Sequence, residues 1–305
     1  MADEKVLAKQ DPTYSQRFTS MVVREFGTQV GKLQLNPFQM RLAQNLFVAI
    51  DNQLKNLDAK RLDTSGGDKR TPIEWKNVNM DKLAVDSVHR VELGLDALIP
   101  NHIHPIPYFN KRLKKYDLDL RIGYAGKDCY RRKMAMEEPV DIVYELVYSN
   151  DEFRPIKKSA ANPVESYEFN IKNSFDRGDV IGGFGYIVYQ DPKKNKLVLV
   201  SRKEMDKSKA QGNDTFWKNH PEMMMIKTVV HRTTAKLPVD PEKVNASFLA
   251  VEQDDSFDVA AERVDDEIEE RANGEVIDIE PEPEEPQATE PPEEPKATGT
   301  EGPDF

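Results

Sequence analysis

Apolar residues recur at helical spacing through the first ninety residues of the chain. Phe18, Val22 and Phe26 are four positions apart, and this pattern ends between Gly27 and Gly31. Asn36-Pro37 is typical of a helix N-cap followed by proline at the first helical position, and an apolar stripe continues from there to Leu57. A polar loop over 63–72 separates this helix from a third one, predicted from Asn79 or Met80 to Leu93.

The pattern changes to alternation from His102 onward. A short strand over 102–109, a basic turn over 111–116 and a return strand over 118–124 predict a β-hairpin. Gly123 and Gly126 interrupt the alternation. Residues 127–136 contain no Gly, Pro or β-branched residue and predict a helix that begins beside a flexible corner.

Strands and helices are mixed in the following hundred residues. Strands are predicted over 140–148, 180–190 and 196–200, and Ser201 and Glu204 form a capping-box pattern that starts a short basic helix. A linker over 210–215 leads to Phe216-Trp217 and to a last helix between Pro221 and Leu237. These elements predict an α+β fold with a mainly antiparallel sheet, packed helices and an N-terminal helical region.

The charge is unevenly distributed. Residues 250–305 hold 3 Lys or Arg and 21 Asp or Glu, a net charge of −18, whereas the whole chain carries −11, so residues 1–249 carry +7. From Glu280 the chain is rich in Pro and Glu and has little apolar surface to offset the entropy of folding. We therefore predict three parts: an N-terminal helical region (1–79) that supplies oligomer contacts, an α+β core (80–245) and a disordered acidic tail (246–305).

Composition also limits the cellular setting. The chain has no apolar run long enough to cross a bilayer, and its N-terminus lacks the apolar core of a signal peptide. Cys129 is the only cysteine, so an internal disulfide cannot form. These features predict a cytoplasmic protein.

Three patterns suggest chemistry. His102 and His104 would share one face of a strand, as metal ligands can, but no further Cys or His cluster completes a site. Asp117 and Asp119 sit in the predicted hairpin, where a solvated strand face is the simpler interpretation. The Gly123–Lys127 stretch is too short for a P-loop, and Asp128 stands where Ser or Thr would bind Mg²⁺. No cofactor is predicted, and a role for a divalent cation as a modulator is left open.

Basic residues provide the remaining signal. They recur over 111–115, 121–133, 193–196, 202–209 and 227–236, interleaved with Tyr124, Tyr130, Phe216 and Trp217. Lys127 and Arg131 are one helical turn apart and can face the same anion beside free backbone N–H groups. This composition indicates a polyanion groove, and nucleic acid is the expected occupant.

Several spaced motifs together resemble one family. Ile122-Gly-Tyr-x-Gly126 before a basic helix, the Ser201–Glu204 helix start, Phe216-Trp217, and the helix from Met223 to Arg232 resemble the RecT/Red-beta family of phage single-strand annealing proteins over roughly residues 80–240. The resemblance implies an ATP-independent recombinase that coats single-stranded DNA, pairs complementary strands and holds the duplex in an oligomeric ring or filament. A phage exonuclease and the host single-strand-binding machinery are the implied partners.

The resemblance also implies a set of DNA-binding residues. By position these are Arg121, Tyr124, Lys127, Arg131, Lys203, Lys207, Lys209, Trp217, Lys227, His231 and Arg232. Ala125 stands where many relatives carry a basic residue, so one phosphate contact is expected to be absent.

Two alternatives stay open. A metal-dependent nuclease would use Asp117, Asp119 or Asp141 and would shorten a labelled strand in the presence of Mg²⁺. A passive single-strand protector would depend on aromatic stacking more than on Lys and Arg, and it would slow annealing.

Overall fold

The structure is a computed structural model, and it describes residues 11–31, 34–63, 71–210 and 214–253. The chain divides into two compact units, residues 1–265 and 266–305, and all the described residues belong to the first. The predicted disorder of the acidic tail beyond residue 253 concerns positions outside the described residues.

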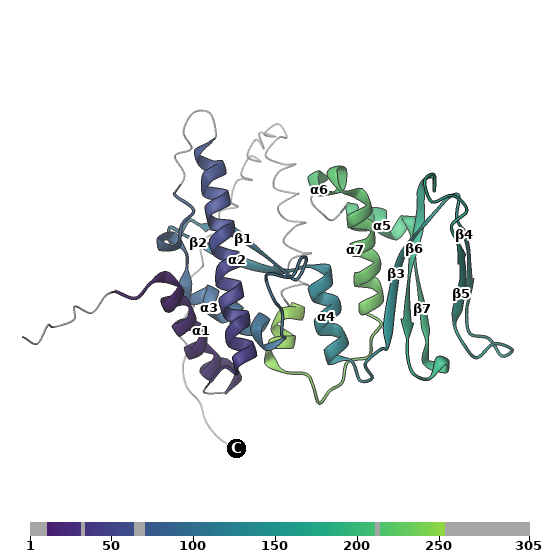
Figure 1. The fold of residues 1–305 in the computed structure, drawn as a ribbon, viewed down its shortest axis with the longest axis horizontal. Helices are drawn as coiled ribbons and strands as arrows, with labels where there is room; N and C mark the ends of the chain where they lie inside the picture. Colours follow the sequence, from purple (N-terminus) through teal and green to yellow (C-terminus); the bar gives the residue numbers. More distant parts are fainter. Residues whose placement is uncertain (1–10, 32–33, 64–70, 211–213, 254–305) are drawn as a thin grey trace, which may run out of the picture. The chain divides into compact units, whose positions relative to one another are not determined.

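Helices make up the N-terminal part, as predicted (Figure 1). These are α1 (Tyr14–Val30), α2 (Pro37–Leu62) and α3 (Met80–Glu92), with a 3-10 turn, η1 (Trp75–Asn77), before α3. Capping boxes at Thr13 and Asn36 start the first two helices, because each side chain accepts a hydrogen bond from the N3 backbone. Gly31, at φ 72°, ends α1 in the left-handed conformation.

A β-hairpin follows, formed by β1 (Ile103–Asn110) and β2 (Lys115–Ile122) in antiparallel register. Helix α4 (Tyr124–Met134) begins two residues later. The hairpin was predicted, but the boundary after it was not: Tyr124 is the first residue of the helix rather than the last of the strand, and the helix ends at Met134 rather than at residue 136.

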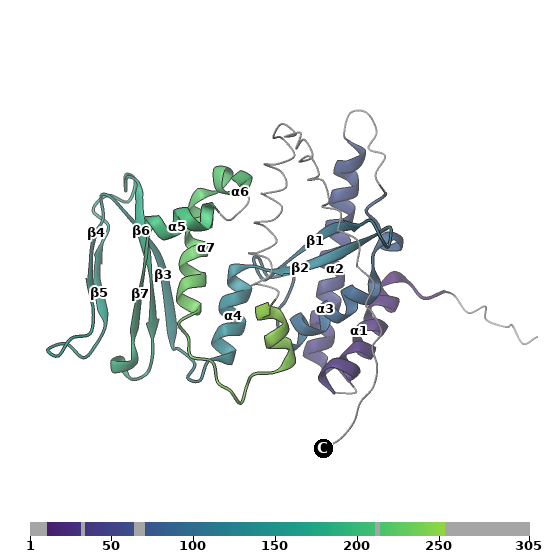
Figure 2. The same ribbon diagram turned by 180° about the vertical axis from the view of Figure 1, so that it is seen from behind.

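The main sheet is antiparallel, with the order β3-β6-β7. Its strands are β3 (Asp141–Tyr148), β6 (Val180–Val188) and β7 (Lys196–Ser201), separated in part by the 3-10 turn η2 (Pro192–Lys194). Helices α5 (Arg202–Lys209), α6 (Asp214–Asn219) and α7 (Pro221–Thr234) come next. Helix α7 packs on the sheet, mostly against β6 (Figure 2).

Two glycines of β6 let α7 approach the sheet. A Cβ at Gly185 would lie 1.9 Å from Thr233 Oγ1, and a Cβ at Gly183 would lie 2.7 Å from Val229 Cγ2. Because no side chain fits between the two elements, the backbone of β6 is the surface on which α7 rests.

A second hairpin was not predicted. It consists of β4 (Glu152–Ile156) and β5 (Ser166–Asn170), and its aromatic side chains cover the main sheet. The Phe153 and Tyr167 rings lie 4.7 and 4.5 Å from the buried Phe184 ring of β6. These aromatic contacts bury one face of the hairpin.

The largest core joins the N-terminal helices to the hairpin, to α4 and to the end of the described chain. Phe18, Val22 and Phe26 of α1 are fully buried in it. The apolar stripe of α1 is therefore covered by the chain itself. Residues 246–253 are helical, and Phe248 and Val251 are buried in the same core, so the folded chain extends beyond the predicted start of the tail at residue 246.

Candidate nucleic-acid interface

The start of α4 is shaped by close backbone packing. A Cβ at Gly123 would lie 2.3 Å from the Asn101 carbonyl oxygen, and a Cβ at Gly126 would lie 2.5 Å from that of His102. The Gly126 N–H donates to Asn101 at 3.0 Å. The interpretation of these glycines as a flexible phosphate-binding corner is therefore replaced by a packing role, because part of the helix N-terminus is covered by the 101–104 backbone.

The cations of α4 contact protein groups. Lys127 is only 8% exposed. Arg131 forms an ion pair with Glu252, and Arg132 pairs with Asp128 at 2.9 Å. Lys133 Nζ donates to the carbonyl oxygens of Leu93 and Gly94 at 3.3 and 3.4 Å. Arg131 and Lys133 thus hold α4 to neighbouring segments, whereas Arg132 forms its ion pair within the helix.

Asp128 links α4 to the main sheet. Besides Arg132, it accepts a hydrogen bond from the Tyr144 hydroxyl of β3. Burial raises the pKa of Tyr144 well above its ordinary value, and the hydrogen bond to Asp128 raises it further. The phenol therefore stays protonated and keeps donating.

The outer face of the first hairpin carries another group of predicted residues. Arg121 lies opposite His104 in the register and donates to the Tyr108 hydroxyl at 3.4 Å and to Asp119 at 3.3 Å. Burial lowers the pKa of His104, and the positive charges of Lys227 and Arg121 lower it further. Lys227 of α7 and Arg121 of β2 therefore act on the same imidazole, which favours its neutral form at pH 7.

Helix α5 provides three of the exposed predicted cations. Its capping box at Ser201 fixes the helix start, and Met205 is buried beneath it. Lys203, Lys207 and Lys209 are all exposed. Hydrogen bonds from Ser201 lower the pKa of Glu204, and the nearby charges of Arg232 and Lys207 add to this effect. Arg232 of α7 is therefore close to α5.

The charges that act on His104 and on Glu204 divide the predicted residues into two groups along α7. Lys227 belongs with Arg121 and the hairpin, whereas Arg232 belongs with Lys207 and α5. His231 is half-buried, one turn after Lys227. His104 was missed as a member of the first group, because the alternation of the strand suggested only a metal ligand.

Two of the predicted DNA-binding residues are aromatic, and both contact other parts of the protein. The Tyr124 hydroxyl accepts a hydrogen bond from Asn101 Nδ2 at 3.3 Å. Trp217 is 3% exposed and packs in a core that includes Met205, Met225 and Val229. Its Nε1 has no hydrogen-bond partner among the described residues. Trp217 therefore supports α5 and α7 from inside, and the Phe216 side chain lies outside the described residues.

The acidic and histidine candidates are separated. Asp117 accepts hydrogen bonds from Asn79 and Asn110 at 2.7 and 2.8 Å, and Asp119 pairs with Arg121. His102 lies before β1, is buried and accepts a hydrogen bond from the Asp96 N–H at 3.4 Å, whereas His104 lies on β1 opposite Arg121, so the two imidazoles have different surroundings. Across the described ranges, no group of three or more His, Cys, Asp or Glu side chains is placed to hold a metal ion.

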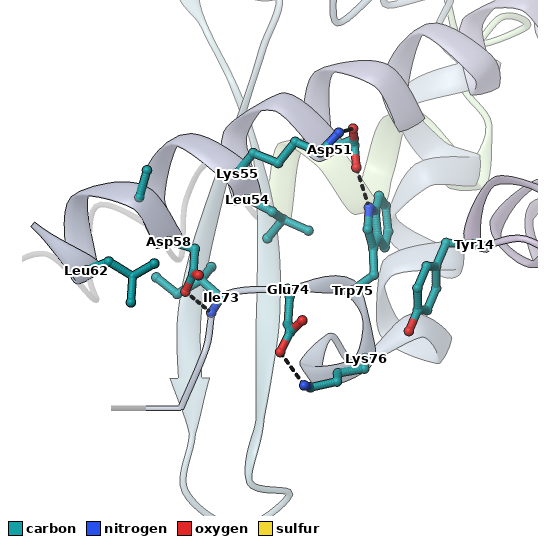
Figure 3. Close-up of a pocket in the computed structure, with 11 residues that line it drawn as sticks. Tyr14, Asp51, Leu54, Lys55, Asp58, Leu62, Ile73, Glu74, Trp75 and Lys76 are labelled. Carbon is teal, nitrogen blue, oxygen red and sulfur yellow. Dashed lines mark hydrogen bonds and ion pairs between the residues drawn. The ribbon is translucent and has the colours of Figure 1, made fainter. Parts of the chain in front are cut away.

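A hollow of about 380 Å³ lies in the N-terminal region, between α2 and the 73–76 segment (Figure 3). Leu54, Ile73 and Trp75 line it, with Tyr14 at one side. Its polar lining is paired: Lys55 binds Asp51 at 2.6 Å, and Lys76 binds Glu74 at 2.5 Å. Asp58 adds a further carboxylate, so the lining is net acidic and does not suit a phosphate.

The sequence model of the RecT family matches residues 89–271, which is more than half of the chain. The chain belongs to the RecT family. The match includes the first hairpin, α4, α5, α6 and α7, which together carry all the predicted DNA-binding residues. The search of curated proteins and the search of solved structures found no match.

Membership of the RecT family makes this chain a phage recombination protein of the annealing type, as the spaced motifs indicated. Among the described helices, none is long and apolar enough to cross a membrane.

Proposed function

We propose that this RecT-family protein anneals single-stranded DNA without ATP, by binding its phosphates through the cations that flank α7. The observation that carries the proposal is the row of exposed lysines on α5 beside Arg232, in a chain of the RecT family. The protein would then pair complementary strands and retain the duplex in an oligomer.

Electrostatics explains why such a surface promotes annealing. Two single strands repel each other through their phosphates, and each flexible strand loses entropy when it is extended. Lysine and arginine side chains offset the repulsion and release counterions from the DNA. A strand held in this way meets its complement at a lower free-energy cost, so no nucleotide needs to be hydrolysed.

The binding mode follows from the pairing step. Since Watson–Crick edges must remain accessible, the protein should hold phosphate and sugar and make few contacts to base edges. Each added base-pair step then contributes stacking of about 1.4 kcal/mol, which drives the reaction forward. Binding of this kind does not depend on base sequence.

The proposed contact residues are the predicted ones on the two groups along α7 and at the start of α4. They are Arg121, Tyr124, Lys203, Lys207, Lys209, Lys227, His231 and Arg232. Lys127 and Trp217 are buried, so we assign them the role of holding α4, α5 and α7 in place. Arg131 is treated separately below, because it already binds an anion.

Assembly and location are part of the same proposal. We expect oligomer contacts in residues 1–79 to use the apolar side chains that the fold leaves exposed there, including Phe38, Val48 and Leu62, because the stripe of α1 is already buried. The proposed partners are a phage exonuclease and the host single-strand-binding machinery. Because a phage recombination protein acts on DNA in the infected cell, we place the reaction in the cytosol.

An annealing assay with complementary labelled oligonucleotides tests the proposal. The triple variant Lys203→Ala/Lys207→Ala/Lys209→Ala should anneal at least about tenfold more slowly at low salt, because each lost phosphate contact weakens DNA binding. The matched control Arg154→Ala/Lys158→Ala/Lys172→Ala removes the same charge from exposed positions in and around the second hairpin and should anneal normally. Equal loss in both variants would contradict the assignment to α5.

The same assay separates the alternatives. Annealing should proceed in the absence of ATP, and repeating it with Mg²⁺ and with a chelator measures any modulation by a divalent cation. Shortening of an end-labelled strand with Mg²⁺ would instead support a nuclease, and slower annealing on protein addition would support a passive protector.

A further inference from the structure

The end of the described chain is bound to α4. Residues 246–253 form the yellow-green helical segment beside α4 in both views (Figures 1 and 2). Phe248 and Val251 are 6% and 2% exposed, and the Phe248 ring meets the Tyr130 ring of α4 edge-on at 6.1 Å. The Ser247 hydroxyl lies 3.1 Å from His89 Nδ1 of α3. This segment is therefore docked through a defined set of contacts.

Its last acidic residue in the described chain, Glu252, binds two groups of α4. Tyr130 donates its hydroxyl to Oε1 at 2.6 Å, and Arg131 Nε donates to the same oxygen at 3.1 Å. Arg131 Nη2 contacts the second oxygen, Oε2. The carboxylate and the guanidinium thus form a two-point pair, which is the geometry in which arginine also binds phosphate.

Arg131 and its neighbour Arg132 differ in the sequence position of the carboxylate that each one binds. Arg132 pairs with Asp128 within α4, four positions away. The carboxylate on Arg131 instead comes from a residue 121 positions along the chain, at the start of the acidic segment. Glu252 can therefore leave Arg131 while α4 remains intact, and the cost of opening residues 246–253 is the loss of this segment's own contacts, chiefly those of Phe248 and Val251.

Arg131 also differs from the lysines of α5 in its solvent exposure. Its side chain is 12% exposed, with the guanidinium 5.5 Å from the centre of the Phe248 ring, whereas Lys203 and Lys207 are open to solvent. A phosphate can reach Arg131 only after residues 246–253 have moved.

We propose that Glu252 is an internal competitor for DNA at Arg131. With residues 246–253 docked, the carboxylate occupies the guanidinium, and release of Glu252 gives Arg131 to a phosphate of single-stranded DNA. The Glu252–Arg131 ion pair lowers the affinity of the free protein for single-stranded DNA. Opening of residues 246–253 then adds one phosphate contact. This inference rests on the proposed function, because it assumes that single-stranded DNA is the ligand.

The test compares Glu252→Gln with the unaltered full-length chain. Glutamine keeps the shape and can still accept the Tyr130 hydrogen bond, but it loses the charge that holds Arg131. Binding of a labelled thymidine oligonucleotide is measured by fluorescence anisotropy over a range of salt concentrations. Loss of the Glu252–Arg131 ion pair should favour opening of residues 246–253. A fully opened segment adds one single-strand phosphate contact, which steepens the slope of log affinity against log salt by up to about 0.7 and tightens binding up to about eightfold at roughly 50 mM salt.

Three further variants separate the effect of the Glu252–Arg131 contact from the effect of net charge. Glu252→Asp keeps the net charge but shortens the side chain, so it should also tighten binding. Glu242→Gln removes one charge from an exposed position ten residues earlier and should leave the slope unchanged. Adding Arg131→Gln to Glu252→Gln should abolish the gain. Circular dichroism of each variant verifies that the fold is retained.

The outcomes separate this inference from the proposed function. If the unaltered chain binds and anneals single strands while Glu252→Gln and Glu252→Asp have its affinity and slope, the competitor role is wrong and the proposed function stands. If only the Glu252 variants bind single-stranded DNA, the competitor role is supported, because Glu252 then prevents binding by the unaltered chain. If none of these proteins binds single-stranded DNA, both are wrong.

Discussion

At the residue scale, the partner of a basic side chain decides what its charge can do. Lys127, Arg131 and Arg132 lie within six positions on α4, and each is buried or paired. Lys207 has the same formal charge but remains exposed on α5. The sequence identified all of these as cations but could not separate them, because Glu252, which occupies Arg131, lies 121 positions away.

Trp217 gives a first test at this scale. Because its ring is 3% exposed among Met205, Met225 and Val229, Trp217→Ala should lower the free energy of unfolding by about 3–5 kcal/mol. Trp217→Phe keeps an apolar ring and removes an N–H that has no described partner, so its cost should stay below about 1.5 kcal/mol. Chemical denaturation followed by circular dichroism measures both, and equal costs would place Trp217 outside the core.

Asp151 gives a test of pH dependence. Its carboxylate is 1% exposed and binds Arg177 at 2.7 Å, and this hydrogen bond is the main cause that lowers the pKa of Asp151 below its ordinary value of 3.8. A carboxylate whose pKa is lowered by folding stabilises the folded state at pH values above its ordinary pKa. This stabilisation is lost as the pH falls from the ordinary pKa through the lowered pKa. The difference in the free energy of unfolding between the unaltered chain and Asp151→Asn should therefore be largest at about pH 6 and should shrink below about pH 4.

The matched control for this titration is Asp176→Asn, which changes an exposed carboxylate in the loop that carries Arg177. Urea denaturation of the three proteins at several pH values provides the comparison. A difference between the unaltered chain and Asp151→Asn that is constant with pH would contradict the role of the ion pair.

At the scale of elements, local patterns predicted most helices and strands, and close packing set their boundaries. The N-cap at Asn36 and the capping box at Ser201 could be predicted because the residues involved are close in the sequence, and the structure adds a capping box at Asn36. The hairpin of β4 and β5 was missed because Arg154 and Pro155 face solvent on β4 and interrupt any apolar alternation. Its stabilising contacts are aromatic and long-range, to Phe184.

Gly126 tests the packing role of the glycines at α4. Alanine is the better helix former by about 1 kcal/mol, so Gly126→Ala would stabilise an unconstrained helix. Its Cβ would instead meet the His102 carbonyl oxygen at 2.5 Å and Ile122 Cγ2 at 2.9 Å. We expect a net loss of about 1–3 kcal/mol in the free energy of unfolding, measured by denaturation. A stabilised variant would restore the interpretation of an open, flexible corner.

At the scale of the whole molecule, opposite charges are linked in one chain. Residues 1–249 carry +7 and residues 250–305 carry −18. The predicted tail starts at residue 246, but residues 246–253 are helical and carry buried Phe248 and Val251, so the folded chain continues past that start. Residues 246–253 contain one acidic residue, Glu252, and were assigned to the tail because of the strongly acidic sequence that follows them.

This boundary determines how the role of the acidic segment is tested. A truncation at residue 250 would remove Val251 and Glu252 from the fold, whereas a chain that ends at Gln253 keeps them. Removing residues 254–305 should tighten single-strand binding, most strongly at low salt, because a tethered polyanion competes with DNA at high effective concentration. Equal affinity of the two chains at low salt would show that the segment does not compete.

The most direct test of the central claim, that exposed cations beside α7 hold the phosphates of single-stranded DNA, is the salt dependence of binding. We predict that Lys203→Ala/Lys207→Ala/Lys209→Ala reduces the slope of log affinity against log salt by about 2, which is about 0.7 for each lost contact. The control Arg154→Ala/Lys158→Ala/Lys172→Ala should keep the slope of the unaltered chain. A slope that is the same in all three proteins would contradict the account.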